Sequence, residues 1–519
     1  MMTMADSRRT RATLGLLLAV FAASVLAAAV PAHAQEQPPA LFSAIPEGVQ
    51  APPSLDARSA YMVDSELVVL DTMALRAESV SATILGDTYT ISREYIDARD
   101  GGDYTWFGSG DRVTDAILVV NGTEVFGLIY AQNRTFEILH VSSDIHEIYE
   151  LDMSKFPPVG TGGDQTDAVS EASGASASAV TIDRDQISRL ESAYVGWKEY
   201  DDDANTDAVT IDVYVAVTEE AIEDHGGTAV GMARLAVDVA NRAYPQNDLP
   251  VSLVLADQRK ISGYADAGNV TADLQNLMDT GNRLFARAHA EIALENADVV
   301  VMLVGDYEPT DDHRDLENTC GRAHVLLAED TSEAFAVVES VCISAHSFTN
   351  VIGRLQGAGY NSENETNSEF SYGHGYYHAG VDRRTIMSQS AGNCDDPRTG
   401  DEEVCEREAI WSDPHRNFFG TTAPAGTVED WNARVVFATA PHIASLRGGA
   451  QSYDSVSPTG AITLPSPVPT NGTMQVNATF SEPVHDWFPP TLTITNGTIS
   501  TAATMAKLSD TRPYAQLIF

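Results

Sequence analysis

Residues 342–361 read Cys-Ile-Ser-Ala-His-Ser-Phe-Thr-Asn-Val-Ile-Gly-Arg-Leu-Gln-Gly-Ala-Gly-Tyr-Asn, and we expect them to contain a helix. They follow directly on Ala334-Phe-Ala-Val-Val338, a short apolar run that is typical of a buried strand. Further upstream, Ile211-Asp-Val-Tyr-Val-Ala-Val217 alternates as a strand, and residues 228–243 have the apolar spacing of a helix. Strands and helices that alternate in this way predict an α/β domain on a mixed sheet over residues 208–448.

The composition is that of a large acidic protein. The chain has 519 residues, a formal net charge of −43 and a hydrophobic fraction of 43%, which predicts two to four domains with sizeable cores. With 31 Lys and Arg against 74 Asp and Glu, the chain lacks the basic excess that follows a phosphate backbone, so we expect no nucleic-acid partner. The acidic surface is explained most simply as one that keeps a secreted protein soluble.

The first 34 residues have the features of a bacterial signal peptide. Arg8, Arg9 and Arg11 precede an apolar run, and Ala32-His33-Ala34 supplies the small residues of a cleavage site. No later segment has the roughly 18 consecutive apolar residues that a membrane helix needs. We therefore predict a protein that is exported, is found outside the cell and has no membrane contact after signal cleavage.

The segments before the α/β domain are predicted as two linkers around a β module. Residues 35–54 are Pro-rich and residues 157–207 are rich in small and polar types, so both are predicted as linkers. Residues 55–156 contain successive strand-like runs, and Asn121-Gly122 between two of them is a hairpin signal. This range is predicted to be an antiparallel β module of about a hundred residues.

Residues 449–519 are predicted as a linker followed by part of an immunoglobulin-like β module. Pro and Thr are frequent there, and strand-like runs such as 474–480 and 492–495 follow. A complete sandwich needs about seven strands over about 100 residues. The chain contains only part of one.

All four cysteines, Cys320, Cys342, Cys394 and Cys405, fall within the α/β region. Disulfides are expected in an exported chain, and three pairings are possible. We favour Cys320 with Cys342 and Cys394 with Cys405, because each pair closes a short loop beside residues 342–361. Zinc binding by these thiols is disfavoured, because the sequence has no CxxC pair.

Several ordered phrases resemble secreted bacterial metzincins, zinc metallopeptidases of the reprolysin-like or peptidyl-Asp metalloendopeptidase type. The phrases are Cys320-Gly321, Ala334-Phe-Ala-Val-Val338, Ser347-Phe348, Tyr372-Gly-His-Gly-Tyr376, Arg384-Thr-Ile-Met387 and Trp411-Ser-Asp-Pro414. The resemblance implies an α+β metzincin-like fold for residues 208–448 and a β-rich propeptide for residues 55–156. It also implies that the helix within 342–361 occupies the place of the zinc-binding HExxHxxGxxH motif.

This resemblance implies that the zinc site has been lost. The three His positions of the motif hold Asn350, Arg354 and Tyr360, and the position of the general base holds Val351. Two features of the motif region remain, which are the turn glycine Gly357 and the Met-turn around Met387. We therefore expect no bound zinc, no other metal and no catalysis by the family mechanism.

Three functions are left open by the sequence. The leading hypothesis is a catalytically inactive pseudopeptidase that binds a peptide or protein, with Arg354 either holding a peptide carboxylate or forming an internal salt bridge. The second is an active secreted zinc metalloendopeptidase with non-standard ligands, for which His346, His374 and His378 are the available imidazoles. The third is an extracellular adhesion or matrix protein in which the C-terminal module binds.

Overall fold

The computed structural model describes most of residues 38–448 and four short strands beyond. The described ranges are 38–46, 61–131, 134–156, 183–200, 208–225, 227–305, 319–363, 365, 368–389, 394–395, 402–403, 405–448, 460–463, 475–480, 504–507 and 514–518. The predicted signal peptide and most of the two predicted linkers lie outside these residues. Within the described residues, no helix has the length and apolar character needed to span a membrane.

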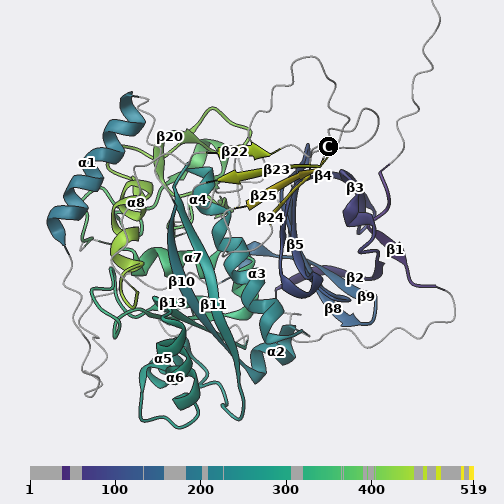
Figure 1. The fold of residues 1–519 in the computed structure, drawn as a ribbon, viewed down its shortest axis with the longest axis horizontal. Helices are drawn as coiled ribbons and strands as arrows, with labels where there is room; N and C mark the ends of the chain where they lie inside the picture. Colours follow the sequence, from purple (N-terminus) through teal and green to yellow (C-terminus); the bar gives the residue numbers. More distant parts are fainter. Residues whose placement is uncertain are drawn as a thin grey trace, which may run out of the picture. The chain divides into compact units, whose positions relative to one another are not determined.

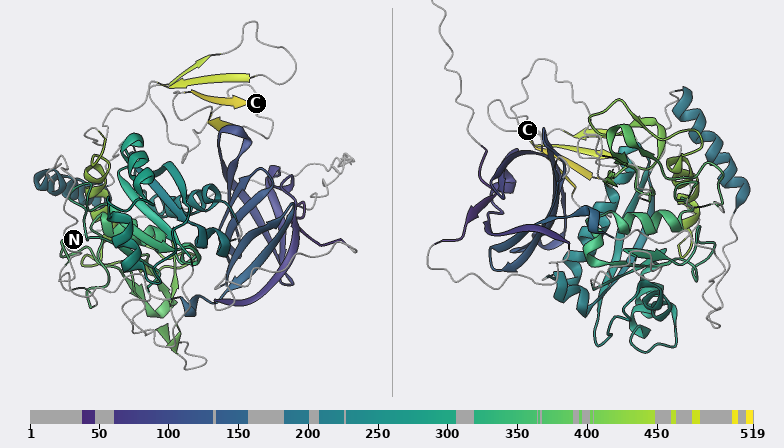
Figure 2. Two further views of the ribbon diagram at one scale, coloured as in Figure 1. Left: turned by 90° about the horizontal axis from the view of Figure 1, so that it is seen from below. Right: turned by 180° about the vertical axis from the view of Figure 1, so that it is seen from behind.

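The β module is a nine-stranded antiparallel sheet that is strongly curved (Figure 2). Its order is β1-β2-β9-β8-β7-β6-β5-β4-β3. The strands are β1 Phe42–Ala44, β2 Met62–Leu70, β3 Ser79–Ile84, β4 Asp87–Ala98, β5 Tyr104–Gly110, β6 Val113–Asn121, β7 Glu124–Ala131, β8 Arg134–Ser142 and β9 Ile145–Leu151. They are accompanied by three 3-10 turns, which are η2 Ala74–Arg76, η3 Asp100–Gly102 and η4 Met153–Lys155.

Two details of the β module differ from the sequence prediction. Strand β1 lies inside the predicted linker 35–54 and pairs with β2, because Leu41 and Phe42 are apolar enough to be buried. The hairpin predicted at Asn121-Gly122 is present, but its loop is Gly122-Thr123, since Asn121 still pairs with Glu124. Gly122 has φ +64°, as the first central residue of a II′ turn requires.

The α/β domain is built on a five-stranded mixed sheet, as the sequence predicts. Its order is β11-β10-β12-β14-β13, and only the edge strand β13 is antiparallel to its neighbour. The strands are β10 Val209–Thr218, β11 Val251–Ile261, β12 Val299–Val304, β13 Gly321–Ala323 and β14 Phe335–Glu339. Three parallel pairings in the middle explain why the β12 segment is apolar throughout.

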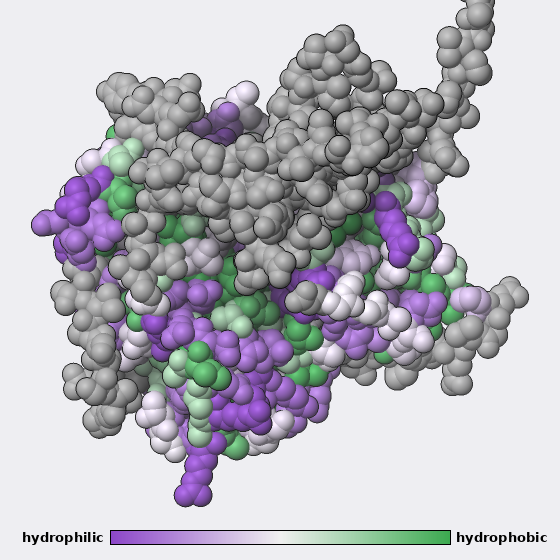
Figure 3. All heavy atoms as spheres, viewed as in Figure 1, coloured by the Kyte–Doolittle hydropathy of each residue, from purple (hydrophilic) through white to green (hydrophobic). Residues whose placement is uncertain are grey.

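Helices cover both faces of this sheet (Figure 1). Alternate residues of β10 and β12 face opposite ways: Val213 and Val301 share one core with α3, α7 and α8, whereas Tyr214 and Val300 share another with α5 and α6. The helices are α2 Glu219–His225, α3 Ala229–Asn241, α4 Ala243–Gln246, α5 Val270–Met278, α6 Ala286–Glu295, α7 Ser347–Leu355 and α8 Asn432–Ile443. On the face seen in Figure 3, hydrophilic residues gather over the region of α5 and α6.

Helix α1, Arg184–Tyr200, lies within the range predicted as a linker, so that prediction is wrong for these residues. The helix forms because it has a partner, helix α8. Tyr194 is fully buried, its ring contacts those of Trp431 and Phe437 at 5.8 and 5.0 Å, and its hydroxyl donates to Asp413 at 3.2 Å. Ile187, Leu190 and Tyr194 have the spacing of a helical apolar face, a signal that the polar composition of the segment obscures.

The segments around α7 and the C-terminus contain short strands. They are β15 Tyr377–His378, β16 Arg383–Arg384, β17 Cys394–Asp395, β18 Glu402–Glu403, β19 Glu406–Arg407, β20 Asp413–Asn417 and β21 Pro424–Ala425, with 3-10 turns η5 Ser340–Ile343 and η6 Ala379–Val381. The C-terminal strands β22 Gly460–Thr463, β23 Gln475–Phe480, β24 Thr504–Lys507 and β25 Tyr514–Ile518 pair antiparallel in the order β22-β23-β25-β24. The immunoglobulin-like assignment of that region stays a prediction.

Cys320 and Cys342 form a disulfide, which is one of the two pairings favoured from the sequence. It joins the residue before β13 to η5 and therefore ties the edge of the sheet to the segment that leads into α7. Cys405 is also disulfide-bonded, whereas the side chain of Cys394, its predicted partner, lies outside the described residues.

Candidate functional site around helix α7

Helix α7 ends in a turn that depends on Gly357. The amide of Ala358 donates to Gly353 O and that of Gly357 to Arg354 O, both at 2.9 Å, which is the Schellman pattern. Gly357 has φ +90°, and a Cβ there would also lie 2.9 Å from the Phe370 ring. The glycine therefore reverses the chain, so that residues 358–361 return along the helix as the sequence predicts.

Asn350 and Tyr360 meet as the reversed chain returns. The Asn350 amide donates to Ile386 O at 3.0 Å, and the Tyr360 hydroxyl donates to Asn350 Oδ1 at 3.4 Å. Both residues are buried, and burial raises the pKa of the Tyr360 hydroxyl above its usual value. Asn350 is therefore held on one side by the Met-turn segment and on the other by Tyr360.

Arg354 is occupied by an internal ion pair. Its Nη1 donates to Glu365 Oε2 at 2.6 Å, and its guanidinium lies over the Tyr360 ring at 4.4 Å. The same Glu365 oxygen accepts the Tyr360 amide at 2.7 Å. The sequence left two roles open for Arg354, a contact with a peptide carboxylate or an internal salt bridge. The structure contains the internal salt bridge. Glu365 was not predicted from the sequence as the partner of Arg354.

Val351 and Met387 have purely packing roles in the structure. Both are fully buried, and the Val351 side chain faces Gly321 of β13. Met387 lies against the helix at Gly353, where an added Cβ would be 3.0 Å from the Met387 sulfur and 2.6 Å from the Trp411 ring. The segment around Met387 therefore packs against α7 at Gly353, a position that has no room for a side chain.

Two arginines near this site have no carboxylate partner among the described residues. The register of the parallel strands β16 and β19 places Arg384 beside Arg407. Arg407 donates to Ala345 O at 2.7 Å and Ser388 O at 3.2 Å, and Arg384 to Ser388 O at 3.4 Å, while the buried Nε atoms of both lack an acceptor. Burial lowers the pKa of Arg407 to about 10, and burial together with Arg407 lowers that of Arg384. This pair was not predicted from the sequence, because only the strand register brings the two residues together.

His346 faces the same cations from the start of α7. Burial, with Arg407 and Arg384 nearby, lowers its pKa to about 3, so the imidazole is neutral at ordinary pH. The other imidazoles do not form a replacement ligand set: His374 contacts the backbone oxygen of Tyr360 at 3.0 Å, and His378 lies on β15. Within the described part of the chain, no group of three or more His, Cys, Asp or Glu side chains has the arrangement of a metal site.

The residues that the sequence resemblance aligns with the motif's ligands do not fit a zinc ion. Zinc sites use imidazole, thiolate or carboxylate ligands, whereas Asn350 and Tyr360 offer an amide and a protonated phenol, and Arg354 is a cation. A guanidinium about 4 Å from a divalent ion would repel it by roughly 8 kcal/mol at an effective dielectric of about 20. We therefore derive no reaction step through a metal at this position.

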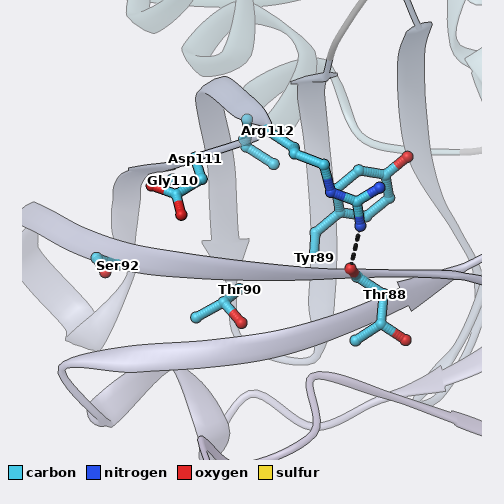
Figure 4. A pocket seen from close by; sticks show the side chains of 8 residues that line it. Thr88, Tyr89, Thr90, Ser92, Gly110, Asp111 and Arg112 are labelled. Carbon is cyan, nitrogen blue, oxygen red and sulfur yellow. Dashed lines mark hydrogen bonds between the residues drawn. The ribbon is translucent and has the colours of Figure 1, made fainter.

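A separate cavity of about 330 Å³ lies on the β module (Figure 4). Its lining is Thr88, Tyr89, Thr90, Ser92, Gly110, Asp111, Arg112 and Val113. The Arg112 guanidinium lies 4.6 Å from the centre of the Tyr89 ring and donates to Thr88 O, so it covers the aromatic face. None of the predicted site residues lines this cavity.

Comparison with known proteins relates the chain to metallopeptidases. No protein-family model matches it. A peptidyl-Asp metalloendopeptidase from Xanthomonas campestris pv. campestris is 27% identical over 455 residues, which cover 84% of this chain and 98% of that protein. The chain is thus similar over most of its length to peptidyl-Asp metalloendopeptidases. Two peptidyl-Asp metalloendopeptidases from strains of Stenotrophomonas maltophilia are each 26% identical to this chain, over 73% of its length and 86% of theirs.

Solved structures resemble this chain only weakly. A chaperone–substrate complex has a TM-score of 0.33 and 16% identity, covering 46% of this chain and 35% of that one. Metalloproteinase-II from Bacteroides fragilis has a TM-score of 0.31 and 9% identity, covering 55% and 81%. These scores are too low to bear on the fold.

Proposed function

We propose that the protein is an exported pseudopeptidase, a metallopeptidase-family protein that does not hydrolyse peptides by the zinc mechanism and binds a peptide or protein instead. The observation that carries this proposal is the Arg354–Glu365 ion pair, with Nη1 and Oε2 2.6 Å apart. A position that supplies a neutral ligand in a zinc site here carries a cation with its own buried counter-ion. Val351 has an apolar side chain, so it cannot act as the general base at that position.

The ligand that we propose is a peptide with an acidic side chain. The relatives are named for peptidyl-Asp cleavage. In this chain, Arg384 and Arg407 are the cations that could hold such a carboxylate, because within the described residues they lack a carboxylate partner and donate only to backbone oxygens. Arginine suits the task, since its planar donors match the two oxygens of a carboxylate.

The proposal also includes export to an extracellular location. It includes no metal, nucleic-acid or membrane partner. These parts of the proposal rest on the signal-like residues 1–34 and on the net charge of −43. A C-terminal adhesion role remains an alternative for residues 449–519. Binding of a partner by those residues alone would favour it.

Metal content and peptide cleavage, measured on the same preparation lacking residues 1–34, test the loss of catalysis. We expect less than stoichiometric zinc and no chelator-sensitive cleavage of casein or of Asp-containing peptides. One zinc per chain together with chelator-sensitive cleavage would overturn the proposal and favour a peptidase with non-standard ligands.

Peptide binding is tested separately with matched fluorescent peptides that differ only in Asp or Asn at one position. We expect the Asp peptide to bind more tightly, and we expect Arg407→Gln to remove the difference. Exposed Arg189 offers a control, because Arg189→Gln lies on α1 and should leave the preference unchanged. Equal binding of the two peptides by the wild-type protein would contradict the acidic-ligand proposal.

A further inference from the structure

The face of α3 turned toward the β module is shaped to fit one ring of that module. Phe126 of β7 lies directly over Gly227 and Gly231. A Cβ added at Gly227 would lie 2.1 Å from the ring and one at Gly231 would lie 2.4 Å from it, so neither position can carry a side chain while the ring is there. Neither glycine has a left-handed φ, so it is the close approach of Phe126 that requires them.

Two buried ion-pair clusters lie further along the chain from this ring, at Asp238 of α3 and at Arg242 just after the helix. Asp238, which is 6% exposed, accepts from Arg99 at 2.8 Å and from the Thr105 hydroxyl at 2.6 Å. At the C-terminal end of the helix, Arg242 donates to Asp115 and Glu94 of the β module.

Arg242 in the second cluster is 4% exposed and lies 2.8 Å from Asp115 and 2.9 Å from Glu94. Separating the module from the helix would leave Asp238 and Arg242 without their partners. Truncating one member of a buried charge pair at an interface weakens binding strongly, because the other member stays unpaired.

The apolar part of the interface is continuous with the domain core. Ile117, Phe126 and Leu128 of the β module belong to the same buried cluster as Met232 and Leu235 of α3. An interface of this kind resembles a core cut in half, which is typical of permanent rather than transient association. The helix is therefore buried on both sides, by the β10–β11 sheet and by the β module.

A third contact extends from the β module to the site around α7. The Tyr130 hydroxyl donates to Ser344 O at 3.0 Å, and its ring stacks on His346 with 5.0 Å between centroids. His346 is the residue immediately before α7, and Arg407 donates to the neighbouring Ala345 O. Tyr130 thus fixes the backbone at the start of the helix that carries Asn350.

We infer that the β module is a permanent part of the folded protein, docked on α3 by Phe126 and the two ion-pair clusters, and that Tyr130 positions the start of α7. This differs from the removable propeptide that the sequence resemblance implies for residues 55–156. It does not rest on the proposed function, since the docking surfaces are the same whether or not the α7 site binds a ligand.

The test is to cut the full chain between the two parts. A specific protease site introduced within residues 160–180 of the protein lacking residues 1–34 allows cleavage after folding. We expect the two fragments to elute together in gel filtration at micromolar concentration and to unfold in one transition. Separation of the wild-type fragments into two folded species in native buffer would overturn the inference.

Gly231→Ala tests the docking surface itself. Alanine is the better helix former, so the substitution should not weaken the α/β domain, yet its Cβ would collide with Phe126. We expect the dissociation constant of the cleaved fragments to rise about tenfold or more. Combining it with Phe126→Leu should restore part of the affinity, and an unchanged dissociation constant in Gly231→Ala would contradict the docking mode.

Asp238→Asn tests the ion-pair contribution, with Glu219→Gln as the matched control. Glu219 forms an exposed pair with Lys260 of the α/β domain at 2.9 Å. We expect Asp238→Asn to raise the dissociation constant by about 30-fold or more, whereas the control should leave it within about threefold. Equal effects of the two substitutions would show that the buried cluster does not hold the module.

Discussion

Arg354 and Glu365 form an ion pair that closes the loop after α7 back onto the helix. The side chains are 13% and 7% exposed, and the Oε2 atom that accepts Arg354 Nη1 also accepts the Tyr360 amide. One carboxylate oxygen therefore joins the helix, the returning chain and the buried cation.

Glu365→Gln should destabilise the protein by about 3 kcal/mol, because it leaves the Arg354 guanidinium with no counter-ion in a mostly buried position. The free energy of unfolding in urea measures this. Glu329→Gln is the control, since Glu329 pairs with Arg184 at 3.0 Å where both side chains are about half exposed, and an exposed pair contributes about 1 kcal/mol at most.

A second substitution, Arg354→Met, should compensate for Glu365→Gln. Arg354→Met combined with Glu365→Gln removes both charges, and replacing a buried ion pair by uncharged groups of similar size is often neutral. We therefore expect the double variant to regain most of the lost stability. If Glu365→Gln is no more destabilising than Glu329→Gln, the ion pair does not hold the loop to the helix.

Gly357→Ala should destabilise the protein by about 2 kcal/mol. Part of the effect is the cost of a left-handed backbone for alanine, about 1 kcal/mol or more, and the rest is the approach to Phe370. Gly263→Ala is the matched control, because Gly263 also has a positive φ of +74° but open space around the Cβ position. Thermal unfolding of the two variants separates the backbone effect from the contact, and equal losses would contradict a packing role for Phe370.

The order of elements predicted the mixed sheet of the α/β domain, because the period of apolar residues reports directly on burial. The return of Tyr360 toward Asn350 followed from the placement of Gly357. The partner of Arg354 could not be predicted, since Glu365 lies in a loop whose residues have no regular spacing. Arg384 and Arg407 are 23 positions apart, and only the pairing of β16 with β19 brings them together. Helix α1 was missed because its stability comes from contact with α8 rather than from its own composition.

The stability of the protein should depend on pH through His346. Its pKa is about 3 in the folded state and about 6.5 in an unfolded chain, so the unfolded state binds one more proton between these values. The contribution of His346 to stability is therefore complete above about pH 6.5 and is lost progressively as the pH falls toward 3. The measurement is the free energy of unfolding as a function of pH.

His346→Asn isolates this contribution, because asparagine tolerates the left-handed backbone found there, with φ +59°, and does not titrate. We expect the slope of stability against pH between about pH 4 and 6 to be smaller in the variant than in the wild type. His140→Asn is the control, since His140 lies on β8 with an exposed ring contact to Ser143 O. Identical slopes in wild type and His346→Asn would mean that His346 is not buried as a neutral imidazole.

Restoring the missing ligands tests the placement of α7 most directly. The fourfold variant Asn350→His, Val351→Glu, Arg354→His and Tyr360→His places imidazoles where Asn350 and Tyr360 already touch and where Arg354 lies over the Tyr360 ring. We expect it to bind about one zinc per chain, because three imidazoles then meet at one point and Glu365 remains to orient one of them. The same variant with Val351 retained should bind zinc but not cleave peptides, since it lacks the general base. A folded fourfold variant that binds no zinc would show that these four positions are not those of the zinc motif.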